Sequence, residues 1–112
     1  MPRVLMLLAY SHANPDGDVT DGFDLSVSLT PQGRLDTEAW QRDPPAWTVR
    51  RLHGGVAEHD GALVRAEDSW VIRVGEEEMP LAGQVIRPGE YVTVRGAGGE
   101  ARIYRIVEVR PG

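Results

Sequence analysis

The sequence of 112 residues contains no cysteine and no lysine. Without cysteine, the chain can form no disulfide framework, no thiolate metal site and no cysteine nucleophile. All twelve basic residues are arginine, which excludes Schiff-base chemistry and a phosphate-binding loop of the Walker type. We therefore expect no cofactor. The absence of cysteine is compatible with a cytoplasmic location, which is our expectation.

The chain also has no long apolar run and no basic stretch. Its longest apolar run covers residues 4–10, which is far too short to cross a bilayer and short for an export signal, so we predict a buried strand there. The formal net charge is −5, and counterion release from nucleic acid requires clustered basic groups. We expect neither a membrane nor a nucleic acid as a partner.

Glycine and proline, in contrast, are frequent. Thirteen glycines and eight prolines divide the chain into short segments, a spacing that favours strands and turns over helices of three or more turns. The clearest strand pattern covers residues 23–30, where four apolar residues from Phe23 to Leu29 alternate with polar ones. Alternation or β-branched composition predicts further strands at residues 34–37, 47–53, 62–66, 69–74, 91–95 and 102–109.

These segments predict a single all-β domain over residues 1–112. We expect a small antiparallel barrel or a two-sheet sandwich of about seven to nine short strands, with at most one short helical turn near residues 37–42. Alternation along each strand is the same in both architectures and does not decide between them. We further predict that residues 4–10 are buried on both faces, and that residues 14–22 and 75–78 form polar loops.

The loop after the first strand carries oxygen ligands at alternate positions. Asn14, Asp16 and Asp18 could fold around a hard cation such as Ca²⁺. The loop does not match an EF-hand, because its sixth position is Val19 and its twelfth is Leu25. The alternative is a turn whose side chains bind their own backbone.

Histidine offers one catalytic hypothesis. His12 precedes this loop and could combine with Asp16 or Asp18 in metal binding or acid–base chemistry. The other two histidines are distant in sequence, and no pair has the close spacing of a metal motif. A metal-dependent hydrolase using His12, Asp16 and Asp18 is therefore our third functional hypothesis.

Arginines on the later strands suggest an anion site. Arg73, Arg95 and Arg102 could line up across neighbouring strands and bind a carboxylate or phosphate. The alternative is cross-strand pairing with acidic residues of the same hairpins. The candidate partners are Glu67, Glu90, Glu100 and Glu108.

Two of the three tryptophans flank a polar stretch. Trp40 and Trp47 could form an exposed aromatic pair at a protein interface, where tryptophan concentrates binding energy. Alternatively, they support the core or cover one end of a barrel.

No motif with catalytic spacing is present. We therefore favour a non-enzymatic protein-interaction or assembly module, whose partner is another protein or a second copy of the chain, since open sheet edges need protection. The alternative hypothesis is a β-barrel that binds a small anionic ligand.

Overall fold

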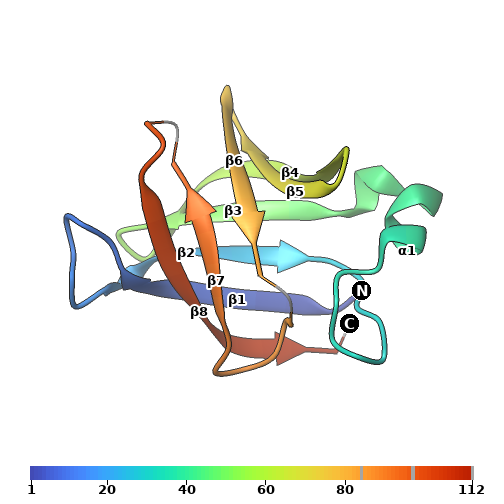
Figure 1. Ribbon diagram of the computed structural model, residues 1–112, viewed down its shortest axis with the longest axis horizontal. Coiled ribbons are helices and arrows are strands. Elements are labelled where there is room, and N and C mark those ends of the chain that lie inside the picture. The colour runs from blue at the N-terminus through green and yellow to red at the C-terminus, as the bar shows by residue number, and fades with distance from the viewer. Residues whose placement is uncertain (84, 97, 112) are drawn as a thin grey trace.

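Eight strands form one closed antiparallel barrel in the computed structural model (Figure 1). The structure describes residues 1–83, 85–96 and 98–111, with the side chain of Glu58 left out. The strands are β1 (Arg3–Tyr10), β2 (Asp18–Ser26), β3 (Thr48–His53), β4 (Val56–Ala66), β5 (Ser69–Val74), β6 (Glu77–Ala82), β7 (Tyr91–Arg95) and β8 (Ala101–Arg110). The helix α1 (Thr37–Arg42) and the 3₁₀ turn η1 (Pro44–Ala46) lie between β2 and β3. The predicted all-β class and the short helical turn are confirmed, and the architecture is the barrel.

Each strand pairs with its sequence neighbour, and β1 pairs with β8 to close the sheet. Within the described residues, β6 and β7 pair at two positions only, Leu81 with Val94 and Ala82 with Thr93. Both positions lie at the end of β6 where the chain leaves the strand. The remainder of β6 diverges from β7 (Figure 1).

Side chains of alternate residues fill the barrel. In β1, Val4, Met6 and Leu8 are buried, whereas the residues between them are only partly buried. The prediction of two buried faces for this segment is wrong, because a strand in a closed barrel has one face inside and one outside. In β2, Phe23 and Leu25 face the interior as their alternation predicts. The strand ends at Ser26, however, so the prediction of a strand through residue 30 is wrong: beyond Ser26, Leu29 forms only an isolated bridge to Leu35.

Two predicted loops and one predicted strand differ from the observed structure. β2 begins at Asp18, inside the predicted polar loop, because Asp18 and Gly22 pair with β1 across a register shift. β6 begins at Glu77, which reduces the predicted acidic loop to the turn at residues 75–76. Pro80, which lacks a backbone N–H, weakened the strand pattern of β6 in the sequence. The predicted strand at residues 34–37 is a single bridge from Leu35 to Leu29.

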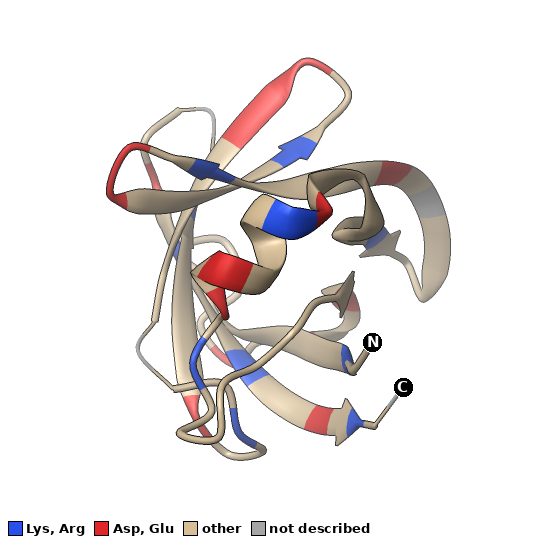
Figure 2. Ribbon diagram, turned by 90° about the vertical axis from the view of Figure 1, so that its right-hand side faces the viewer, with Lys and Arg blue, Asp and Glu red and all other residues tan. Residues whose placement is uncertain are grey.

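The connections divide the barrel into two ends. In a meander of antiparallel strands, alternate turns lie at the same end, so the β1–β2, β3–β4, β5–β6 and β7–β8 turns share what we call the open end. Both termini and the connection that carries α1 lie at the opposite, closed end (Figure 1). Figure 2 looks onto the closed end and shows α1 lying across it.

Tryptophans fill the closed end. The rings of Trp47 and Trp70 stack with centroids 5.2 Å apart and an interplanar angle of 2°. Trp40, from α1, meets Trp70 edge-on at 6.1 Å, and its indole Nε1–H donates to the carbonyl oxygen of Leu63 at 3.2 Å. The Asp36 side chain caps α1 by accepting from the N–H of residue 39 at 3.1 Å.

Candidate ligand-binding site

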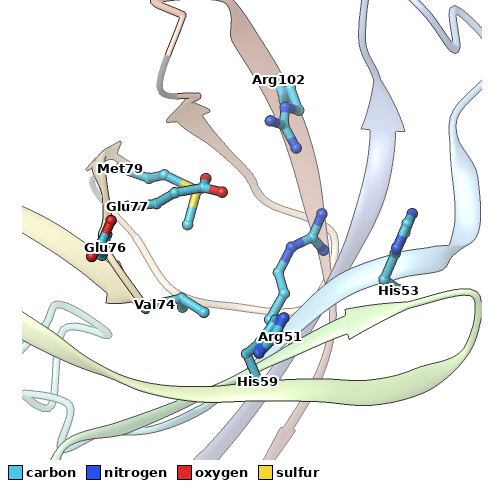
Figure 3. Close-up of a pocket in the computed structure, with 9 residues that line it drawn as sticks. Arg51, His53, His59, Val74, Glu76, Glu77, Met79 and Arg102 are labelled. Atoms are coloured by element: carbon cyan, nitrogen blue, oxygen red, sulfur yellow. The ribbon is translucent and has the colours of Figure 1, made fainter.

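A cavity of about 550 Å³ occupies the open end of the barrel (Figure 3). Its walls come from β3, β4, the β5–β6 hairpin and β8. Its volume falls within the range of small-molecule binding sites. The lining residues are Arg51, His53, His59, Val74, Gly75, Glu76, Glu77, Met79 and Arg102.

Arg51 is held in place on the inward face of β3. Its Nη1 donates to Oδ1 of Asp21 at 2.6 Å, to the carbonyl oxygen of Gly22 at 2.9 Å and to that of Leu52 at 2.6 Å. Its Cζ lies 4.7 Å from the centroid of the Phe23 ring, a cation–π contact. The side chain is only 14% exposed. These contacts fix the guanidinium group at the inner wall of the cavity.

Asp21 is the centre of this network. The same Oδ1 that accepts from Arg51 also accepts from the Tyr104 hydroxyl at 3.1 Å. Tyr104 is fully buried, and its ring packs edge-on against Phe23 at 5.1 Å. Burial, followed by the negative charge of Asp21, raises the pKa of Tyr104 to about 12. Tyr104 therefore stays protonated at neutral pH and remains a hydrogen-bond donor to the carboxylate.

Two guanidinium groups face the same cavity. Arg102 lies on β8 two residues before Tyr104 and shares its inward face, and its Nη2 donates to Oε1 of Glu100 at 3.1 Å. Among the described residues, none accepts a hydrogen bond from Nε or Nη2 of Arg51. Figure 3 shows Arg51 and Arg102 directed into the cavity from β3 and β8. Paired guanidinium groups of this kind suit carboxylates and phosphates.

The wall formed by the β5–β6 hairpin differs from the arginine wall. Val74 and Met79 are buried and contribute apolar surface to the cavity. Glu77 pairs with Val74 across the hairpin, and its carboxylate extends over the cavity beside Met79 (Figure 3). No cation of the described residues lies within ion-pair distance of Glu77.

The structure does not bring the three predicted arginines together. Arg73 and Arg95 are exposed on the outer face of the barrel, where Arg73 pairs with Glu78 at 2.8 Å and Arg95 donates to a backbone carbonyl. Of the three, only Arg102 lines the cavity, and it pairs with Glu100, two residues earlier in the chain rather than across the hairpin as predicted. Sequence reasoning missed Arg51, although a signal existed: Arg51 follows Trp47 and Val49 on the apolar face of β3, where a charged residue is unexpected.

The predicted aromatic pair lies at the closed end. Trp47 is 1% exposed, and Trp40 is partly buried with its indole N–H already donating to the β4 backbone. These positions correspond to the alternative interpretation, tryptophans that cover one end of the barrel.

The acidic loop folds back on its own chain. The backbone oxygen of Asn14 accepts from the N–H groups of Ser11 and Gly17, each at 3.0 Å. Oδ1 of Asp18 accepts from the Thr20 hydroxyl at 2.6 Å and from its N–H at 2.8 Å. These bonds, the hydroxyl first, lower the pKa of Asp18. A cation held by Asn14, Asp16 and Asp18 stays a prediction.

His12, Asp16 and Asp18 form no metal-binding cluster in the part of the chain that the structure describes. Among all the described residues, no three His, Asp or Glu side chains gather closely enough to hold a metal ion. His12 lines a second cavity of about 410 Å³ with Asn14, Asp21 and Arg102. Arg102 therefore stands between this cavity and the larger one.

Comparison with known proteins gives no relative: no family model, no curated protein and no solved structure matches this chain. Of the helices that the structure describes, none is long and apolar enough to span a membrane. The interpretation of the site therefore rests on its own residues.

Proposed function

We propose that this protein binds a small organic anion, bearing a carboxylate or phosphate group, in the cavity at the open end. One observation carries the proposal: Arg51 is anchored by Asp21 and still directs unused donors into the cavity beside Arg102. A bound anion would accept hydrogen bonds from both guanidinium groups. Such charge-assisted bonds are about twice as strong as bonds between neutral groups.

Core packing alone does not account for the polar network of Asp21, Arg51 and Tyr104. Removing Arg51 and Asp21 from water costs free energy, and apolar side chains of similar size fill such a position at least as well. The closed end of the same barrel is filled in that way, by three tryptophans. Charged groups retained in a partly buried cavity wall are a common property of binding sites.

Preorganisation favours affinity at this site. Hydrogen bonds to three acceptors and the contact with Phe23 already immobilise Arg51. The ligand therefore does not have to order this long side chain, which otherwise costs about 0.5–1.5 kcal/mol per immobilised side chain.

A protein-interaction or assembly module remains a separate hypothesis, and two features that suggested it are used otherwise in this fold. Trp47 is buried, and barrel closure pairs the strands. The short edge left beside β7 carries Glu77, Glu78 and Pro80. Charges and proline on an edge discourage the addition of another strand.

The test is a titration of ¹⁵N-labelled protein with pentanoate and, separately, with pentyl phosphate. We expect shift changes in amide signals of residues that line the cavity, with the tryptophan indole signals of the closed end unchanged. Arg102→Met should weaken binding about tenfold or more, because a charge-assisted hydrogen bond is lost.

The matched control is Arg73→Met, which removes an arginine from the outer face. This variant should bind each probe within about twofold of the unmodified protein, since the change lies outside the cavity. Unchanged indole signals establish that each variant is folded. Absence of shift changes at the cavity, or equal weakening by the two substitutions, would overturn the proposal.

A further inference from the structure

The cavity at the open end carries charges of both signs on different walls. Arg51 and Arg102 project from β3 and β8, and Glu77 projects from the β5–β6 hairpin (Figure 3). In the described residues, Glu77 forms no ion pair with either arginine. The positive and negative groups therefore share one cavity without an ion pair between them, and the arginines pair instead with Asp21 and Glu100.

The inward position of Glu77 follows from the alternation of β6. Met79 and Leu81 are buried inside the barrel, whereas Glu78 and Pro80, which alternate with them, are exposed, as is Glu77 at the start of the strand. Glu77 continues the inward series at the mouth, opposite Val74. Glu78, one residue later, faces outward and pairs with Arg73. The two neighbouring glutamates thus occupy opposite sides of the barrel wall.

A purely anionic ligand satisfies only part of this cavity. Its negative charge is attracted by the two arginines and repelled by Glu77, whose exposed carboxylate lies at the mouth of the cavity. A purely cationic ligand has the reverse problem. A molecule with one charge of each sign, separated by a short chain, is attracted at both walls.

We infer that the ligand is a small zwitterion, with its carboxylate directed to Arg51 and Arg102 and its ammonium group directed to Glu77. The inference rests on the proposed function and adds the class of ligand. The buried side chains of Val74 and Met79 line the same cavity and supply contact for a short hydrocarbon segment.

The experiment compares two ligands that differ only in the ammonium group, 5-aminopentanoate and pentanoate. Each is titrated into the ¹⁵N-labelled protein, and amide signals of the cavity residues are followed. We expect 5-aminopentanoate to bind about tenfold more tightly, because one charge-assisted hydrogen bond is gained. Shorter and longer ω-amino acids, each compared with the corresponding carboxylate, locate the best charge separation.

Glu77→Gln is the decisive variant, and Glu78→Gln is its matched control on the outer face. Glu77→Gln should weaken the binding of 5-aminopentanoate and strengthen the binding of pentanoate, so that the two affinities become about equal. Glu78→Gln should leave the preference for the zwitterion unchanged. Because both substitutions are nearly isosteric and lie at the rim, the tryptophan indole signals should confirm that each variant is folded.

The outcomes separate the two proposals. If both ligands bind at the cavity with equal affinity at every chain length, and Glu77→Gln changes neither, the zwitterion is wrong and the anion site stands. If neither ligand changes the cavity signals, both proposals fail.

Discussion

The hydrophobic core of the barrel ends in aromatic stacking at one end and in a hydrogen-bonded polar network at the other. At the closed end, Trp40 of α1 meets Trp70, which stacks on Trp47, with ring centroids 6.1 and 5.2 Å apart. At the open end, a carboxylate, a guanidinium group and a phenol are joined by hydrogen bonds of 2.6 and 3.1 Å around Asp21. Both arrangements end the core, and the second borders the cavity lined by Arg51 and Arg102.

The difference assigns separate roles to the two ends. Apolar burial is non-directional and scales with the area removed from water, so the tryptophan end contributes mainly to stability. A partly buried ion pair contributes little net stability and is sensitive to the loss of either partner. Substitutions at the open end that leave the Arg51–Asp21 pair intact, at Arg102 or Glu77, should therefore alter binding without dismantling the fold.

The largest effect is expected at the closed end, from Trp47→Ala. Trp47 is 1% exposed and stacks on Trp70, and removal of a buried tryptophan side chain costs about 3–5 kcal/mol. Urea denaturation should show this loss in the free energy of unfolding. As a control, Val19→Ala, at a residue 79% exposed, should change that free energy by less than about 0.5 kcal/mol. A loss below about 1 kcal/mol for Trp47→Ala would contradict the role given to this end.

An intermediate effect is expected at the open end, from the titration of Tyr104. Between pH 10 and 12 the unfolded chain loses the phenolic proton, whereas the folded protein keeps it because its pKa is about 12. The contribution of protonated Tyr104 to the free energy of unfolding is complete below pH 10 and is lost as the pH rises through 12. Since one pKa unit corresponds to about 1.4 kcal/mol, the total loss is about 2–3 kcal/mol.

Denaturation at a series of pH values checks this prediction, and the absence of lysine removes the usual interfering titration from that range. Tyr104→Phe keeps the ring that packs on Phe23 and should abolish this part of the pH dependence. If the free energy of unfolding of Tyr104→Phe falls with pH as steeply as that of the unmodified protein, another group causes the pH dependence.

The smallest effect is expected on the outer wall, from Arg73→Met. The Arg73 and Glu78 side chains are 51% and 61% exposed, and exposed ion pairs contribute about 0–1 kcal/mol. Thermal or urea denaturation should therefore detect a change of at most about 0.5 kcal/mol. A substantially larger loss would mean that inner and outer arginines do not differ as the structure implies.

Much of the fold was predictable because its signals are local. The alternation that predicts the end of β2 at residues 23–26, the break between the strands at residues 62–66 and 69–74, and the helical turn near residues 37–42 each depend on neighbouring residues. β6 was missed where Pro80 interrupts the pattern. The candidate site was predicted only in part, as Arg102, because the other two predicted arginines alternate to the outer face.

The sequence by itself determined the all-β class and most strand positions, because both follow from periodicity over a few residues. Its lack of cysteine and lysine also excluded reactions that need a thiol or a side-chain amine. Only the tertiary structure decided that the sheet closes, and with it the site. Asp21, Arg51 and Tyr104 lie on β2, β3 and β8, and they meet because β1 pairs with both β2 and β8. That pairing joins the two ends of the chain, and no local pattern encodes a contact between residues so far apart in sequence.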